Sequence, residues 1–117
     1  MKKTLVTLSA LIFVAGPALA KDDYHVLGFG NSSCGTWAAD KNNKVLRAAD
    51  ITWLQGYLTA FNRFGPEAPI GNITRGIDSE GLAGWIDNYC SVNPTDTINK
   101  AAGKLVLHLA ATKPKAQ

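Results

Sequence analysis

The side chains in this chain that could carry nucleophilic, redox or metal chemistry are two cysteines and two histidines. Cys34 and Cys90 lack the C-x-x-C spacing that is usual for a redox pair. A zinc site would need two further ligands at suitable spacing, but His25 and His108 lie at opposite ends of the chain. A Cys–His nucleophile would need a free thiol, which oxidation opposes in an exported protein. We therefore expect no catalytic residue, no metal and no cofactor.

The two cysteines instead predict one structural disulfide, Cys34–Cys90. An even number of cysteines in a small exported domain is typical of a disulfide framework. The bond would close a long loop, for which the chain-entropy estimate is roughly 4 kcal/mol. That is a large share of the total stability of a domain of this size, which is about 5–10 kcal/mol.

Carboxylates and aromatic rings are the other candidates for a functional site. Asp78 and Asp87 lie nine residues apart on one predicted helix and do not share a face. We interpret them as a helix cap and a solvated charge. Aromatic residues recur at helical spacing, which is more often a sign of core packing than of a ligand platform. The candidates for a protein-binding surface are Trp53, Tyr57, Phe61, Trp85 and Tyr89.

The first twenty residues predict export. Lys2 and Lys3 precede an apolar run from Leu5 to about Ala15, and the segment ends in a small-x-small motif at Ala20. The run is too short for a membrane span, which needs about 20 apolar residues. We expect a signal peptide over residues 1–20, and then a single domain over residues 21–117 in the periplasm or the medium, with no stable membrane insertion.

The charge of the mature domain excludes two classes of partner. Without Lys2 and Lys3, ten of the twelve Lys and Arg residues remain against nine Asp and Glu. The cations are not clustered, whereas nucleic-acid binding depends on clustered cations that displace counterions. A membrane-surface helix with a lysine-rich face is also absent from the sequence.

Hydrophobic periodicity predicts three main helices. The first starts near Lys44 and ends at Gly65-Pro66, and its expected buried stripe is Leu46, Ala49, Trp53, Gly56, Tyr57 and Ala60. The residues expected to widen this stripe are Leu54, Leu58, Phe61 and Phe64. Gly56 and Ala60 would let a neighbouring helix approach closely. A long loop over residues 65–77 leads to a second helix, which Asp78 or Ser79 caps. Its expected buried face is Leu82, Trp85, Ile86, Tyr89 and Cys90.

Asn93 and Pro94 are expected to end the second helix and begin the third. Proline disfavours helix at the preceding residue but suits the first helical position, with Asn93 as the cap. The third helix would be followed by a frayed tail over residues 112–117. Residues 21–33 are expected to form an extended arm with room for one short strand, and residues 34–44 a turn or a short helical turn. The sequence thus predicts an all-α fold: a small bundle of three main helices, an extended amino-terminal arm and one disulfide.

The order of these features resembles a known group of small exported bacterial proteins. One cysteine precedes the first helix, that helix contains W-L-Q-G-Y-L-T-A, and the second ends in Y-C-S-V-N-P-x-D before an Ala-rich helix. This layout, over roughly residues 34–110, is similar to the acid-stress chaperones of the HdeA type. The resemblance implies an all-helical periplasmic domain with one disulfide, and acid-triggered dissociation followed by client binding through apolar surface. The chain differs from that family in its longer Gly/Pro loop and its tryptophan-rich helices.

A second resemblance is to the Tai/Rap-type immunity proteins of type VI secretion. Those proteins are also small, exported, helical and disulfide-bonded, with a "GY" helix, although their second cysteine usually sits differently relative to the last helices. That resemblance implies blocking of a peptidoglycan-cleaving effector. We therefore expect a non-enzymatic binding or chaperone-like protein of HdeA-like architecture. The alternative is an immunity or inhibitor protein, or an accessory subunit, that binds one exported protein or envelope assembly. In both cases the partner is another protein, and a homodimer is allowed.

Overall fold

The computed structural model of the chain describes residues 24–66 and 71–112. Its elements are a short 3₁₀ helix, η1 (Gly28–Asn31), and the helices α1 (Cys34–Asp40), α2 (Lys44–Phe64), α3 (Ser79–Val92) and α4 (Ile98–Thr112). No strand occurs in these two ranges, where Ser33 and Thr97 form an isolated bridge. The predicted all-α fold is confirmed. The predicted signal peptide, residues 1–20, and residues 113–117 of the predicted tail lie outside the described residues.

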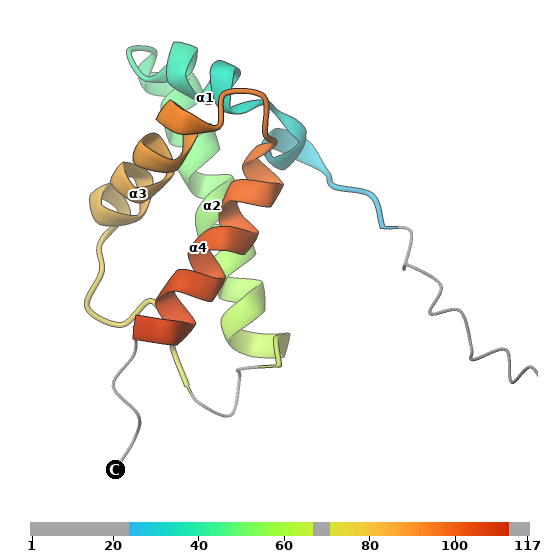
Figure 1. Cartoon of the computed structure of the whole chain (residues 1–117), viewed down its shortest axis with the longest axis vertical. Helices are drawn as coiled ribbons and strands as arrows, with labels where there is room; N and C mark the ends of the chain where they lie inside the picture. Colours follow the sequence, from blue (N-terminus) through green and yellow to red (C-terminus); the bar gives the residue numbers. More distant parts are fainter. Residues whose placement is uncertain (1–23, 67–70, 113–117) are drawn as a thin grey trace, which may run out of the picture.

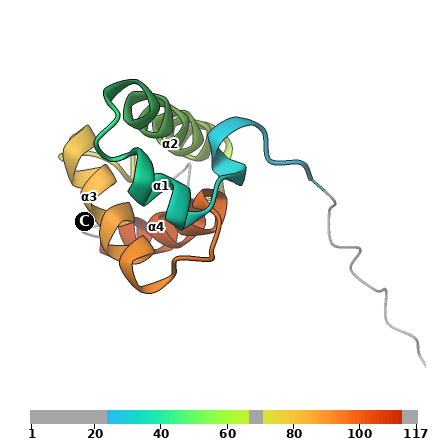
Figure 2. The same ribbon diagram turned by 90° about the horizontal axis from the view of Figure 1, so that it is seen from above.

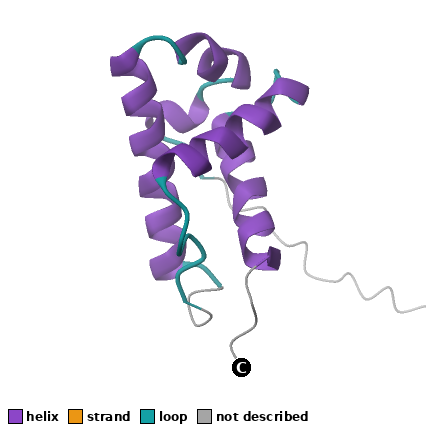
Figure 3. Ribbon diagram, turned by 90° about the vertical axis from the view of Figure 1, so that its left-hand side faces the viewer, coloured by secondary structure: helices purple, strands orange, loops and turns teal. Residues whose placement is uncertain are grey.

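The short helix α1 lies at one end of the bundle that the other three helices form (Figure 1). α2 and α4 run side by side in the same direction, and α3 runs beside them in the opposite direction (Figure 1). Seen from above, α1 lies in the middle of the other three (Figure 2). In the side view of Figure 3, α2 and α4 stand upright, and the described part of the loop from α2 to α3 lies near their lower ends. No helix of the described ranges is long and apolar enough to cross a membrane.

The amino-terminal part is more helical than predicted. Residues 34–40 form a full helix, α1, so the bundle has four α-helices rather than three. The Ser33 side chain caps α1 by accepting a hydrogen bond from the Thr36 amide at 3.1 Å. Within the predicted arm, residues 28–31 form η1 rather than a strand. The described segment before Gly28 is free of helix, and we call residues 24–27 the arm segment.

Trp37 of α1 is the centre of the core, and periodicity did not identify it. Its side chain is completely buried, and so are large apolar side chains from α2, α3 and α4. They are Leu54, Leu58, Ile86, Ile98 and Leu105. A helix of seven residues gives too few turns for a hydrophobic period to be recognised. The shortest α-helix of the described ranges therefore supplies the largest fully buried side chain.

The predicted buried face of α2 is partly wrong. Leu54 and Leu58, which were expected to widen the stripe, are buried, but no residue of the stripe itself is fully buried. The buried residues of this helix are Asp50, Leu54 and Leu58, whereas Leu46 is 37 % exposed. Trp53, Tyr57 and Phe61 are partly buried against the core. A stripe moved by one residue turns by about 100° around a helix, which places the three aromatic side chains at the edge of the interface. Gly56 is exposed, and a Cβ at Gly56 would meet no atom within 4 Å, so it is not a point of close helix approach.

The corner between α3 and α4 also differs from the prediction. Asn93 is the carboxyl-terminal cap of α3, and α4 begins at Ile98 rather than at Pro94. The intervening segment satisfies the start of α1. The Cys34 amide donates to the Asp96 carbonyl at 2.8 Å, and the Gly35 amide donates to the Pro94 carbonyl at 3.1 Å. The first amides of a helix lack partners within the helix, so this corner forms a capping platform for α1.

The predicted disulfide is confirmed. Cys34 at the start of α1 is bonded to Cys90 in the last turn of α3, with an S–S distance of 2.03 Å. Both cysteines are buried. The bond therefore joins α1 to α3, the helix that is followed by the capping platform of α1.

The loop after α2 is attached to that helix by one side chain. Gly65 ends α2 as predicted, and its amide donates to the Phe61 carbonyl at 2.8 Å. Beyond residues 67–70, which are not described, the Asn62 Oδ1 accepts from the Ile73 amide at 2.9 Å. The Ile73 side chain is only 4 % exposed. As predicted, the second helix is capped by Asp78, whose carboxylate accepts from the Gly81 amide at 2.8 Å.

Candidate functional site

The arm segment is held against the bundle by Trp53 of α2. The Trp53 Nε1 donates to the Leu27 carbonyl at 2.8 Å. The indole ring lies directly over Gly30 of η1, since a Cβ at that position would lie 1.9 Å from the ring. Only glycine permits this close approach. Trp53 thus fixes where η1 and the arm segment leave the bundle.

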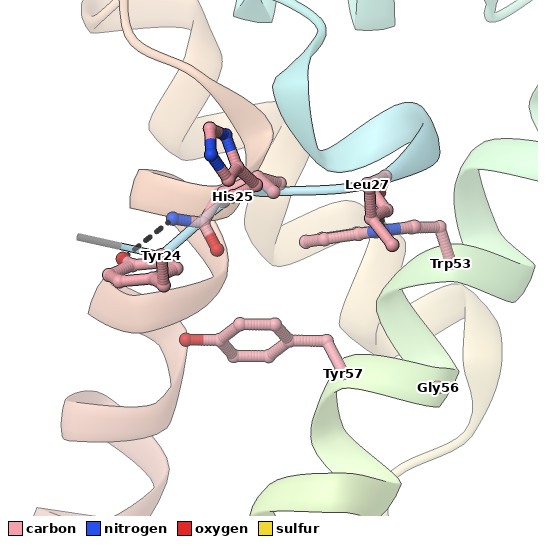
Figure 4. Close-up of a pocket in the computed structure, with 8 residues that line it drawn as sticks. Tyr24, His25, Leu27, Trp53, Gly56 and Tyr57 are labelled. Carbon is pink, nitrogen blue, oxygen red and sulfur yellow. Dashed lines mark hydrogen bonds between the residues drawn. The ribbon is translucent and has the colours of Figure 1, made fainter. Parts of the chain in front are cut away.

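A groove of about 500 Å³ lies between the arm segment, α2 and α4. We call it the arm groove. In Figure 4 the Trp53 and Tyr57 side chains project from α2 toward the arm segment. Their ring centroids are 5.4 Å apart, with an angle of 32° between the ring planes. The lining residues are Tyr24, His25, Val26, Leu27, Trp53, Gly56, Tyr57 and Asn99.

The polar side chains that line the arm groove are those of Tyr24, His25, Tyr57 and Asn99, together with the Trp53 indole. The Asn99 Nδ2 donates to the Tyr24 hydroxyl at 3.3 Å, which ties the far end of the arm segment to α4. Burial, and to a lesser extent the neighbouring Tyr24, raises the pKa of Tyr57 above its ordinary value of 10.0. No Lys, Arg, Asp or Glu is among the residues that line the groove. The arm groove is therefore suited to an uncharged, largely apolar group that can lie against aromatic rings.

The predicted protein-binding residues fall into separate places. Trp53 and Tyr57 meet in the arm groove, and Phe61, one turn further along α2, packs against the core without lining the groove. Trp85 and Tyr89 lie on α3, where their rings stack with centroids 5.7 Å apart. The rings do not form one continuous platform.

The aromatic pair on α3 has polar neighbours. His108 of α4 lies beside Trp85, with ring centroids 5.7 Å apart. The Tyr89 hydroxyl donates to Asp96 at 2.6 Å, and Lys100 lies 2.8 Å from the other oxygen of that carboxylate. The hydrogen bonds from Lys100 and Tyr89 lower the pKa of Asp96. Tyr89 is thereby fixed by the capping platform of α1.

Asp87 is not the solvated charge that the sequence predicted. Its carboxylate accepts from the Trp37 Nε1 at 2.6 Å and from Arg47 at 3.0 Å, and it pairs with Lys41 at 3.1 Å. The Arg47 guanidinium also lies 4.4 Å from the centroid of the Trp37 ring. Burial opposes the charged form of Asp87, but the three donors outweigh burial and lower its pKa. Asp87 thus joins α1, α2 and α3 one turn from the disulfide.

Asp50 is a buried carboxyl that the sequence analysis overlooked. It is 1 % exposed, and neither of its oxygens has a hydrogen-bond partner among the described residues. Burial and the nearby Asp40 raise its pKa from 3.8 to about 6, although Arg47 acts in the opposite direction. One signal was available, because Asp50, Leu54 and Leu58 recur every four residues.

The described ranges contain no cluster of metal-ligating side chains and no free cysteine. Within these ranges no three His, Cys, Asp or Glu side chains lie close enough together to hold a metal ion, and both cysteine sulfurs are in the disulfide. Comparison of the chain with protein-family models, with curated proteins and with solved structures finds no match in any of the three. A proposal of function therefore rests on the arm groove and its chemistry.

Proposed function

We propose that this chain is a non-enzymatic, chaperone-like binding protein of the bacterial envelope, which holds apolar segments of other proteins in the arm groove. The observation that carries this proposal is the groove itself. It places two aromatic rings at an open surface position and has no Lys, Arg, Asp or Glu in its lining. Grooves of this kind bind apolar side chains, and aromatic residues dominate the energetics of protein interfaces.

Two further features support a role outside the cytoplasm. The amino-terminal sequence has the pattern of a signal peptide. The disulfide joins the segment before the first long helix to a later helix, as the resemblance to HdeA-type chaperones implies. Disulfides of this kind persist in oxidising compartments such as the periplasm.

Acid provides a trigger for a larger binding surface. Near pH 3 most carboxylates are protonated, and ten Lys and Arg, two His and the new amino terminus give a charge of about +13. As the pH falls further, through the lowered pKa of Asp87, protonation also removes the carboxylate that joins three helices. The resulting self-repulsion loosens compact states, while the disulfide limits expansion. Loosening would expose the Trp53–Tyr57 and Trp85–Tyr89 pairs to a client.

The proposal is tested by the aggregation of a denatured client protein, followed by light scattering at pH 7 and at pH 2–3. We expect protection at both values, and increased binding of an apolar dye at the lower pH. A protein that gains apolar exposure in acid but protects no client is not a chaperone. A protein that stays folded and binds no dye at pH 2–3 has no acid switch.

A second candidate function is an immunity or inhibitor protein with one exported partner. The feature that favours it is the definite geometry of the arm groove, which Trp53 and Asn99 hold from both sides. A fixed groove suits one partner better than many. This candidate requires tight binding of a single exported protein near neutral pH and no general protection of clients. Affinity measurement with the product of a neighbouring secretion-effector gene distinguishes the two.

A further inference from the structure

We propose that the arm segment is an edge to which an extended segment of the partner adds as a strand, with one uncharged aromatic or large aliphatic side chain in the arm groove. This inference rests on the proposed function and names its mode of binding. Strand addition gives affinity through main-chain hydrogen bonds and selectivity through a pocket for a side chain.

The backbone of the arm segment is extended and unpaired. Leu27 has φ −97° and ψ 148°, which are typical of a strand. The amides and carbonyls of Tyr24, His25 and Val26 form no hydrogen bond with any other described residue. Unpaired main-chain groups along an extended segment are a template for another strand. The segment therefore offers the donors and acceptors that an extended peptide needs.

Both ends of this edge are fixed in place. The Leu27 carbonyl accepts from Trp53 at 2.8 Å, and the Tyr24 hydroxyl accepts from Asn99 at 3.3 Å. The segment is otherwise open to solvent, since the side chains of Tyr24 and Leu27 are 67 % and 79 % exposed. A fixed edge loses less conformational freedom when a partner binds. Strand addition thus requires little rearrangement of this chain.

The arm groove provides a side-chain pocket beside the edge. Its volume of about 500 Å³ is within the range of small-ligand pockets. A Cβ at Gly56 would meet no atom within 4 Å, so the surface of α2 is open at this position. Trp53 and Tyr57 flank the opening with ring faces (Figure 4).

The absence of Lys, Arg, Asp and Glu from the lining of the arm groove determines which side chain it favours. Because no Lys, Arg, Asp or Glu lines it, a charged side chain would lose its hydration without gaining a partner. An uncharged aromatic or aliphatic side chain avoids that cost. The favoured partner segment therefore combines an extended backbone with one large apolar side chain. A free apolar molecule and a second copy of this chain are alternative occupants.

The test uses capped seven-residue peptides of alternating Thr and Ser with a central Phe. Binding is followed by the amide NMR signals of the arm segment and the indole signal of Trp53. Two isomers carry N-methyl groups on alternate residues, so that each isomer blocks one edge of the peptide. We expect binding to weaken by roughly tenfold or more for one isomer only, because the blocked edge loses several hydrogen bonds. Replacement of Phe by Ala is expected to weaken binding by a similar factor.

Two protein variants provide matched evidence for the pocket. Gly56→Leu fills the arm groove and is expected to weaken peptide binding by roughly tenfold or more. Gly84→Leu is the control, because Gly84 is also helical and its added Cβ would meet no atom within 4 Å. This variant is expected to bind like the original protein. Thermal unfolding of both variants checks that they are folded.

Other results would overturn the inference. If both N-methyl isomers bind like the unmodified peptide, strand addition is wrong, but the arm groove remains a binding site. If no peptide binds while the protein protects a client and Gly56→Leu abolishes that protection, strand addition is wrong and the proposed function stands. If neither peptide binding nor client protection occurs, both are wrong. Displacement of a protein dimer by the peptide, seen by sedimentation, would identify a second copy as the occupant and also overturn the inference.

Discussion

Asp50 gives this protein an unusual dependence of stability on pH. Its pKa is raised in the folded state to about 6, above the ordinary 3.8, so the folded protein binds this proton more tightly than the unfolded chain. The stabilisation by the proton is complete below the unfolded pKa and is lost as the pH rises through the folded pKa. At pH 7 the ionised Asp50 carboxylate lowers the free energy of unfolding by at most about 3 kcal/mol.

The substitution Asp50→Asn tests this consequence. Asparagine has nearly the same shape but no charge, so the variant is expected to be more stable than the original protein at pH 7. The advantage is up to about 3 kcal/mol and shrinks to nearly zero at pH 4. Urea unfolding at the two pH values measures it. A variant that is destabilised equally at both would contradict the account of Asp50.

Asp87 is expected to behave in the opposite way. Its pKa is lowered in the folded state, so its contribution to stability is present above the unfolded pKa and lost as the pH falls through the folded pKa. Asp87→Asn should lower the unfolding free energy at pH 7 by about 1–3 kcal/mol, because Arg47 loses its charged partner. The loss should shrink as the pH is lowered toward 3.

The matched control for Asp87 is Asp78→Asn. Asp78 is the cap of α3, and asparagine caps helices about as well as aspartate. This variant is expected to change stability by less than about 0.5 kcal/mol. Equal effects of the two substitutions in denaturant unfolding would show that the contacts of Asp87 have no special role.

Local patterns in the sequence identified some functional residues and missed others. Cys34, Cys90 and the Asp78 cap follow from residue type and local spacing, and the structure contains them as predicted. Trp53 and Tyr57 were among the predicted binding residues. Their partner Asn99 was not, because it reaches the groove from α4 and no local pattern connects residues so far apart.

At the scale of elements, the long loop is held to α2 through Asn62. This side chain accepts from the Ile73 amide and donates to Asn72 at 2.9 Å. Asn62→Ala is expected to accelerate tryptic cleavage at Arg75, which is exposed, by several fold, because the segment loses its attachment. The two fragments should stay together through Cys34–Cys90 until the disulfide is reduced.

Asn88→Ala is the control for this prediction. Asn88 is exposed on α3, and its side chain makes no hydrogen bond with another described residue. Its substitution should leave the rate of cleavage unchanged. If trypsin cuts either variant within a helix sooner than at Arg75, the loop is not the element that opens most easily.

The helices show which sequence signals are reliable. α3 and the end of α2 were predicted because a capping residue, a hydrophobic period and a terminal glycine agree. The stripe on α2 was centred on the wrong residues because small residues such as Ala60 were counted as buried, although Leu54 and Leu58 were expected beside it. Pro94 was placed in α4 because proline suits a first helical turn. Its carbonyl instead accepts from Gly35, a tertiary contact that local preference does not encode.

At the scale of the whole molecule, export and oxidation predict a definite mass. Protein recovered from the periplasm should lack residues 1–20 and be two hydrogens lighter than the reduced chain. No cysteine should react with an alkylating agent before reduction, since both sulfurs are bonded. Intact-mass spectrometry measures these quantities. Two alkylated cysteines in the native protein, or an uncleaved amino terminus, would contradict the proposed compartment.

The central claim is that the arm groove holds apolar segments of other proteins. Its most direct test is the light scattering of a denatured client diluted into buffer at pH 7, with the original protein, Gly56→Leu and Gly84→Leu compared at equal concentration. Both glycines are open helical positions, so only the filling of the groove separates the two variants. We predict that the original protein and Gly84→Leu suppress aggregation and that Gly56→Leu loses most of this effect. Equal suppression by all three proteins, or no suppression by any, would contradict the claim.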